Sequence, residues 1–189
     1  VLLSQTQLLH SSVEIGSISE VRGNAQVLRD KPYGAELAFN IQQMDDVRTE
    51  TGRVAITFAD SSTVKLTEHS KLVIDEYIYD PDPSKSKMAL KFASGTARFI
   101  TGKFNNKSNI SIRTPTADIA IRGTDFTCTV DELGRSLVIL LPDENGISSG
   151  EIIVSTGMGS VTLNKPYQAT TVSVYENNPT KPVTLDISL

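Results

Sequence analysis

The chain has 189 residues and a formal net charge of −4 at pH 7, so it is long enough for one domain with a substantial core. The acidic balance excludes a general nucleic-acid binder, because neutralising phosphates requires a surplus of Lys and Arg. One cysteine and two histidines exclude a disulfide framework and leave little for metal or catalytic-triad chemistry. No apolar run approaches the ~18 residues of a membrane span, so membrane insertion is not expected.

The first thirteen residues contain neither the basic segment nor the apolar core of a secretory signal peptide. We expect residues 1–13 to form an N-terminal arm or a short helix. Either a signal has been removed before residue 1, or the protein is used or assembled in the compartment where it is made. These alternatives leave a virion, the cell surface or the periplasm as locations, with the first two favoured.

From residue 14 to residue 176 the repeated signal is alternation of apolar and polar residues. Val54, Ile56 and Phe58, for example, alternate with Arg53 and Thr57. Similar runs, short and rich in Val, Ile and Thr, recur along the chain with glycines between them, as is typical of strands joined by turns. The pattern predicts a single all-β domain over 14–176 with very little helix, either twisted and β-solenoid-like or β-sandwich-like.

The segment from residue 80 to residue 87 contains two prolines and no apolar residue, which predicts a surface loop between two strands. Acidic residues at 75–82 lie beside a locally basic stretch that begins at Lys85 and includes Lys87 and Lys91. We expect these charges to form a mixed, solvated surface; the alternative is that the two groups face each other, within one molecule or between neighbours.

The last segment, residues 177–189, is predicted to contain a turn followed by a strand. Val183, Leu185, Ile187 and Leu189 alternate with polar residues up to the end of the sequence. A strand of this kind has to bury its apolar face, against its own sheet or against a neighbouring subunit.

The most distinctive stretch runs from Ile112 to Phe126. Pro115 favours an extended Thr114, alternation places Ala117, Ile119 and Ile121 toward the core, and Gly123 allows a bend. We expect Arg122 to pair with Asp125 or Asp118 and lock a structural turn, so that Arg122→Ala would cost roughly 3–5 kcal/mol; a ligand site is the alternative. The predicted structural residues are Thr114, Pro115, Ala117, Asp118, Arg122, Gly123, Thr124, Asp125 and Phe126.

Four blocks of the chain, in order, resemble the FecR domain family. They are residues 16–29, residues 46–62, Phe92–Phe99 and the Thr114–Phe126 stretch, which is similar to a pattern of the kind T-P-x-A-x-x-x-[IV]-R-G-T-x-F. In the second block Ser61 stands where glycine is usual. The resemblance covers about residues 14–176 and implies an all-β fold without enzymatic activity.

The resemblance implies two kinds of role. The named family member is a periplasmic regulator that relays iron-siderophore status to a sigma factor, using an anti-sigma segment, a membrane helix and a C-terminal subdomain. Similar domains also occur as free-standing modules in surface, secreted and phage virion proteins. Because this sequence contains no membrane helix or anti-sigma segment, we expect the second kind of role.

The sequence contains no motif typical of a metal site, a catalytic nucleophile or a dinucleotide-binding site. There is no HExxH pair, no calcium-loop spacing, no G-x-S-x-G nucleophile and no complete dinucleotide-binding glycine motif. Cys128 alternates with Phe126 and Val130, which predicts a buried, inert thiol. No catalytic residue, cofactor or metal is predicted, and the protein is not expected to be an enzyme.

The main functional hypothesis is therefore a structural or protein-interaction module in a multi-subunit assembly, as in a virion or a surface structure. Its partners would be other protein subunits, including further copies of itself paired through edge strands. Two alternatives remain: a periplasmic FecR-type sensor module that relays a signal to a sigma factor, and a carbohydrate-binding or adhesive surface module.

Overall fold

The computed structural model of the chain describes residues 15–80, 82–102 and 109–187. Within these ranges nearly all regular structure is β, with one short 3₁₀ turn, η1 (Pro83–Lys85). The all-β prediction is confirmed. The N-terminal arm predicted for residues 1–13 lies outside the described residues, and the proposed domain boundaries at 14 and 176 stay predictions.

The strands form one continuous sheet that is folded into two layers and is not closed into a barrel. Layer A contains, in spatial order, β4 (Asn40–Ile41), β1 (Gly16–Arg22), β6 (Arg53–Phe58), β7 (Thr63–Leu66), the second half of β9 (Lys87–Ile100), β12 (Asp125–Val130), β13 (Ser136–Leu140), β16 (Gln168–Val172) and β17 (Val183–Thr184). Layer B contains β3 (Pro32–Gly34), β2 (Ala25–Leu28), β5 (Asp46–Thr49), β8 (Lys71–Ile78), the first half of β9, β10 (Asn109–Arg113), β11 (Asp118–Arg122), β14 (Glu151–Ser155) and β15 (Ser160–Leu163).

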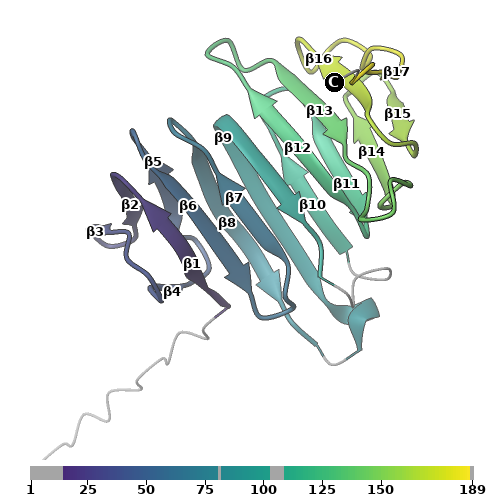
Figure 1. Cartoon of the computed structure of the whole chain (residues 1–189). Helices are drawn as coiled ribbons and strands as arrows, with labels where there is room; N and C mark the ends of the chain where they lie inside the picture. Colours follow the sequence, from purple (N-terminus) through teal and green to yellow (C-terminus); the bar gives the residue numbers. More distant parts are fainter. Residues whose placement is uncertain (1–14, 81, 103–108, 188–189) are drawn as a thin grey trace, which may run out of the picture.

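Figure 1 shows how the chain advances from one end of the molecule to the other, with the purple strands at one side and the yellow strands at the opposite side. Hairpins alternate between the layers as the chain proceeds, and the β9–β10 pairing is parallel whereas the other pairings between named strands are antiparallel. The two layers are those of a sandwich, and the sequential advance is that of a solenoid. The structure therefore combines the two alternatives that the sequence left open.

Strand β9 joins the layers at Gly95. Residues 87–94 pair with β8, and residues 95–100 pair with β12. Gly95 has a φ of 93°, and a Cβ at this position would lie 2.6 Å from the Cα of Ser70. Only glycine supplies both the backbone conformation and the close approach at the point where β9 passes from layer B to layer A.

The core lies between the layers and follows the period of two. Ala117, Ile119 and Ile121 are buried while Asp118 and Ala120 face outward, as the alternation predicts. Three phenylalanines fill the centre of the molecule: Phe99 stacks on Phe126 with ring centroids 5.1 Å apart and meets Phe92 edge-on at 6.0 Å. Cys128 is fully buried beside them on β12, so the prediction of a buried thiol is confirmed.

The loop prediction for residues 80–87 is confirmed for the described residues 80 and 82–86, which connect β8 to β9 and contain η1, while Lys87 begins β9. Two pairs of these side chains face each other within one molecule, as in the alternative arrangement. Lys91 Nζ lies 3.0 Å from Asp75 Oδ1, and Lys87 Nζ lies 2.7 Å from Glu76 Oε2. Neighbouring strands therefore neutralise part of the acidic stretch.

The C-terminal strand is much shorter than the sequence predicts. Only Val183 and Thr184 pair with β16, and the side chains of Val183, Leu185 and Ile187 are 57%, 38% and 51% exposed. The expectation that these side chains are buried against their own sheet is wrong. The reason is that the segment follows the outermost edge of layer A, where no further strand lies beyond it among the described residues.

Candidate functional site

The Thr114–Ala117 turn, which precedes β11, is held by a cluster of buried hydroxyl groups. Ser136 Oγ lies 2.7 Å from both Thr114 Oγ1 and Thr116 Oγ1. Thr116 Oγ1 also donates to the carbonyl of Gly134, and the Ala117 N–H donates to Thr114 Oγ1 at 3.0 Å. All three hydroxyl side chains are buried with partners, so the cluster fixes the turn against β13 and presents no free group to a ligand.

Pro115 completes this turn on its outer side. A Cβ placed on Gly134 would lie 3.1 Å from Pro115 Cβ, so the proline ring packs against the turn that leads into β13. Gly134 also has a φ of 79°, a conformation that glycine adopts without cost.

The Gly123 bend transfers the chain from layer B to layer A. Gly123 has a φ of 54°, and Gly150 approaches so closely that a Cβ on Gly150 would overlap the carbonyl oxygen of Gly123. Beyond the bend, the carbonyl of buried Thr124 accepts a hydrogen bond from Thr101 N, and Asp125 N donates to Ser149 Oγ, each at 3.0 Å. Phe126 then enters the core.

The predicted lock between Arg122 and Asp125 or Asp118 is wrong. Arg122 is exposed, and its nearest acidic group is Glu151, at 3.8 Å. Arg122 lies on the outer face of layer B, whereas Asp125 lies on β12 in layer A, because the bend between them changes layer. Asp118 accepts instead from Arg113 Nε at 2.8 Å and from the Tyr175 hydroxyl at 3.2 Å.

Arg98 is the partner of Asp125. Its Nε and Nη2 donate to the two carboxylate oxygens at 2.8 and 2.5 Å, and these hydrogen bonds raise the pKa of Arg98 above its usual value. The pair connects the Phe92–Phe99 block with the Thr114–Phe126 block. Sequence reasoning missed it, because alternation shows which face a residue lies on but not which strands become neighbours.

A second ion pair, also missed, connects Arg29 at the end of the first block with Asp45, the residue just before the second block. Arg29 donates twice to the fully buried Asp45, each time at 2.7 Å, and Asp45 also accepts from Gln42 N at 2.8 Å. The Arg29 guanidinium lies 5.5 Å from the ring centre of Phe39 and 5.7 Å from that of Tyr33. No local sequence signal marks this pair.

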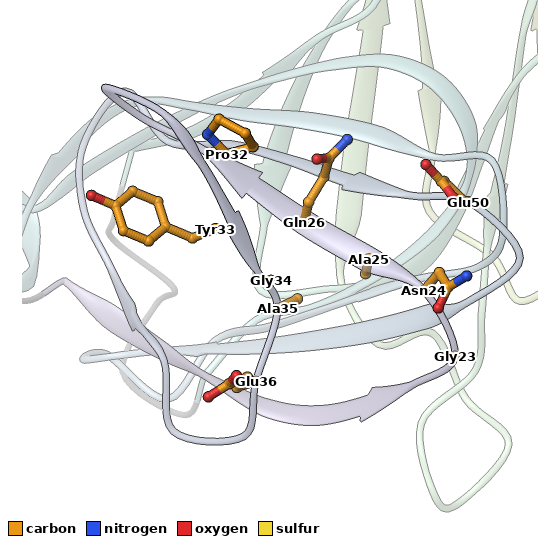
Figure 2. Close-up of a pocket in the computed structure, with 10 residues that line it drawn as sticks. All are labelled: Gly23, Asn24, Ala25, Gln26, Pro32, Tyr33, Gly34, Ala35, Glu36 and Glu50. Carbon is orange, nitrogen blue, oxygen red and sulfur yellow. The ribbon is translucent and has the colours of Figure 1, made fainter.

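A groove of about 420 Å³ lies beside the β2–β3 hairpin (Figure 2). Asn24, Gln26, Tyr33, Glu36 and Glu50 contribute its functional groups, and glycines and alanines form much of the remaining wall. The Tyr33 hydroxyl donates to Asp30 at 2.9 Å, which raises the pKa of Tyr33 and lowers that of Asp30. The carboxylates and the two amides of the groove suit hydrogen-bond donors, but none of the nine predicted residues lines it.

The described residues contain few side chains suited to catalysis or metal binding. No group of three or more His, Cys, Asp or Glu side chains there is close enough to hold a metal ion. Burial raises the pKa of the Cys128 thiol to about 12, so this thiol is neutral at physiological pH. No helix in the described ranges is long and apolar enough to span a bilayer.

A comparison with known protein families matches the region that holds the last three of the four blocks described above. The sequence model of the FecR protein family matches residues 45–143, which is just over half of the chain and includes both Arg98 and Asp125. The chain belongs to the FecR protein family. This FecR-family membership confirms the resemblance found in the sequence, and the family is of a regulatory, non-enzymatic kind.

Two crystal structures of a putative anti-sigma factor from Parabacteroides distasonis resemble this FecR-family chain. Each has a TM-score of 0.57 and 15% sequence identity, and the match covers 75% of this chain and 60% of the other. At this identity the likeness shows a shared fold, and the chain spans only about three fifths of the length of that protein. A comparison with curated proteins gives no match.

The main functional hypothesis, a structural subunit of a virion or surface assembly, is wrong. The FecR family match supports the signalling alternative instead. The expectation failed because it was based on finding no membrane helix and no anti-sigma segment in the sequence. Such segments have no bearing on what the β domain itself does. Proteins of the FecR anti-sigma type do act through other proteins, which agrees with the prediction of protein partners.

Proposed function

We propose that this FecR-family chain is the sensor module of a regulator that relays a signal to a sigma factor. The observation that carries the proposal is the family match over residues 45–143. These residues include the central strand β9, which belongs to both layers, and the Arg98–Asp125 pair that joins β9 to β12. A shared fold with the Parabacteroides distasonis protein adds support.

The geometry favours binding over catalysis. The buried polar groups around the Thr114–Ala117 turn hold the backbone, and the one thiol is neutral and inaccessible. The 420 Å³ groove is an open surface feature that lacks a nucleophile paired with a base. In this proposal the module is not an enzyme: it holds a rigid two-layer surface on which another protein docks.

The proposal is tested in the organism that encodes the chain. The coding segment is removed, and transcripts are measured across the genome before and after complementation with the intact segment. We expect the genes under one sigma factor to change together and to return on complementation. A matched control, complementation with Leu133→Ser, changes a side chain that is 76% exposed and should restore expression fully. Unchanged expression of every sigma-factor regulon would refute the proposal.

A further inference from the structure

The last strand of layer B, β15, has an open outer edge. Among the described residues, β14 is the one strand that forms a ladder with β15. Their hairpin is closed by a bond from Thr156 N to Gly159 O at 2.8 Å, and hydrogen-bonded pairs alternate along an antiparallel ladder. The backbone N–H and C=O groups of Ser160 and Thr162 therefore point away from β14, toward the open edge.

The other ends of the two layers are shorter, blocked or covered. On β3 the bond from Ala35 N to Ala25 O fixes the alternation, so Pro32 faces the outer edge and has no N–H to offer. Strand β4 has two residues. At the far end of layer A, Thr180 N donates to Thr171 O and β17 pairs with β16. Strand β15 is thus the longest uncovered edge in the described part of the chain.

The β15 edge also lacks the features by which proteins usually protect an edge. It contains no charged residue, no proline and no bulge. At one end Met158, in the turn between β14 and β15, is 63% exposed. At the other end stands Lys165, which is exposed. The edge therefore runs from an apolar end to a cationic end.

We propose that β15 binds an extended segment of a partner protein, which adds to layer B as an antiparallel strand. The segment would bond through its backbone to Ser160 and Thr162, place an acidic residue near Lys165, and place an apolar residue against Met158. This inference rests on the proposed function in one respect, namely that the partner is a protein.

A second copy of the chain fits this edge less well. Two β15 strands related by a two-fold axis would pair Ser160 with Thr162 of the other copy, and the same register would place Met158 opposite Asn164, next to Lys165. The apolar end of each copy would then meet a polar and cationic end.

The probe is a capped octapeptide with Asp first, Leu last and alternating Thr and Val between them. Amide hydrogen exchange of the full chain is measured by NMR at increasing concentrations of the peptide. We expect exchange at Ser160 and Thr162 to slow about tenfold near 90% saturation, because it then proceeds through the roughly one tenth of the protein that is unbound. Peptide N-methylated at its fourth and sixth residues should lose this effect, and peptide methylated at its third and fifth residues should keep it.

Two variants of one residue provide the matched comparison. Thr162→Pro removes the outward N–H and should abolish peptide binding, while Thr162→Val keeps the N–H and should bind as the wild type does. Because the N-methylated peptides need no variant, the result holds even if Thr162→Pro unfolds. Absence of protection at millimolar peptide, or equal binding by the two methylated peptides, would overturn the proposal. Protection without peptide that grows with protein concentration would overturn it in favour of a second copy.

The two proposals fail in different ways. If removal of the whole segment changes a sigma-factor regulon while the peptide experiment fails, the sensor role stands and the β15 site is rejected. If the peptide binds as described but no regulon changes on removal, the edge is a binding site and the sensor role is rejected.

Discussion

The Arg98 guanidinium donates two hydrogen bonds to the carboxylate of Asp125, at 2.8 and 2.5 Å, across neighbouring strands of layer A. Arg98 lies on β9, the strand that both layers share, and Asp125 is the first residue of β12 after the chain has changed layer at Gly123. The ion pair therefore ties the layer change to the central strand.

Removal of this pair should destabilise the protein moderately. We expect Asp125→Ala to lower the free energy of unfolding by about 1–2 kcal/mol, because two charge-assisted bonds are lost at a site that is only partly shielded from water. Urea unfolding of Asp125→Ala, Arg98→Ala and the double variant measures the coupling between the two residues. Additive single effects would show that the pair contributes nothing beyond its separate side chains.

The Arg29–Asp45 pair should matter more, because Asp45 is fully buried. Arg29→Ala leaves a buried carboxylate without its cation, and we expect a loss of about 3–5 kcal/mol. Lys31→Ala is a suitable control, since Lys31 lies nearby on the same turn and its Nζ lies over the Tyr33 ring, 5.2 Å from the ring centre. Chemical unfolding followed by circular dichroism measures both variants, and equal losses would contradict the assignment.

Arg122 allows a direct test of where sequence reasoning failed. The structure leaves Arg122 exposed with Glu151 at 3.8 Å, so Arg122→Ala should change the free energy of unfolding by less than about 0.5 kcal/mol. The sequence-based expectation is roughly 3–5 kcal/mol. Urea unfolding separates these values, and a loss of several kcal/mol would restore the lock that the structure contradicts.

Period-two alternation was sufficient to predict the layers locally, because it records which side chains face the core: Ile119 and Ile121 are buried and Ala120 is not. It could not predict partners. The distance from Arg122 to Asp125 in the sequence is three residues, yet the Gly123 bend sends them to different layers, and Asp125 meets Arg98 from a strand formed 27 residues earlier. The exposed C-terminal side chains were missed for a related reason, since alternation does not show whether a covering layer exists.

Cys128 predicts a pH dependence of stability in alkaline solution. Burial raises the pKa of its thiol from an ordinary value of about 9 to about 12, so the folded protein retains the proton that the unfolded chain releases. Ionisation of the unfolded chain lowers the free energy of unfolding as pH rises from about 9 toward 12, and this contribution is absent below pH 9.

Cys128→Ala should show a shallower decline in the free energy of unfolding over this pH range than the wild type. The comparison isolates the thiol because buried Tyr77, whose pKa burial also raises, is present in both proteins. Parallel curves for the two proteins would show that the thiol does not titrate differently on unfolding.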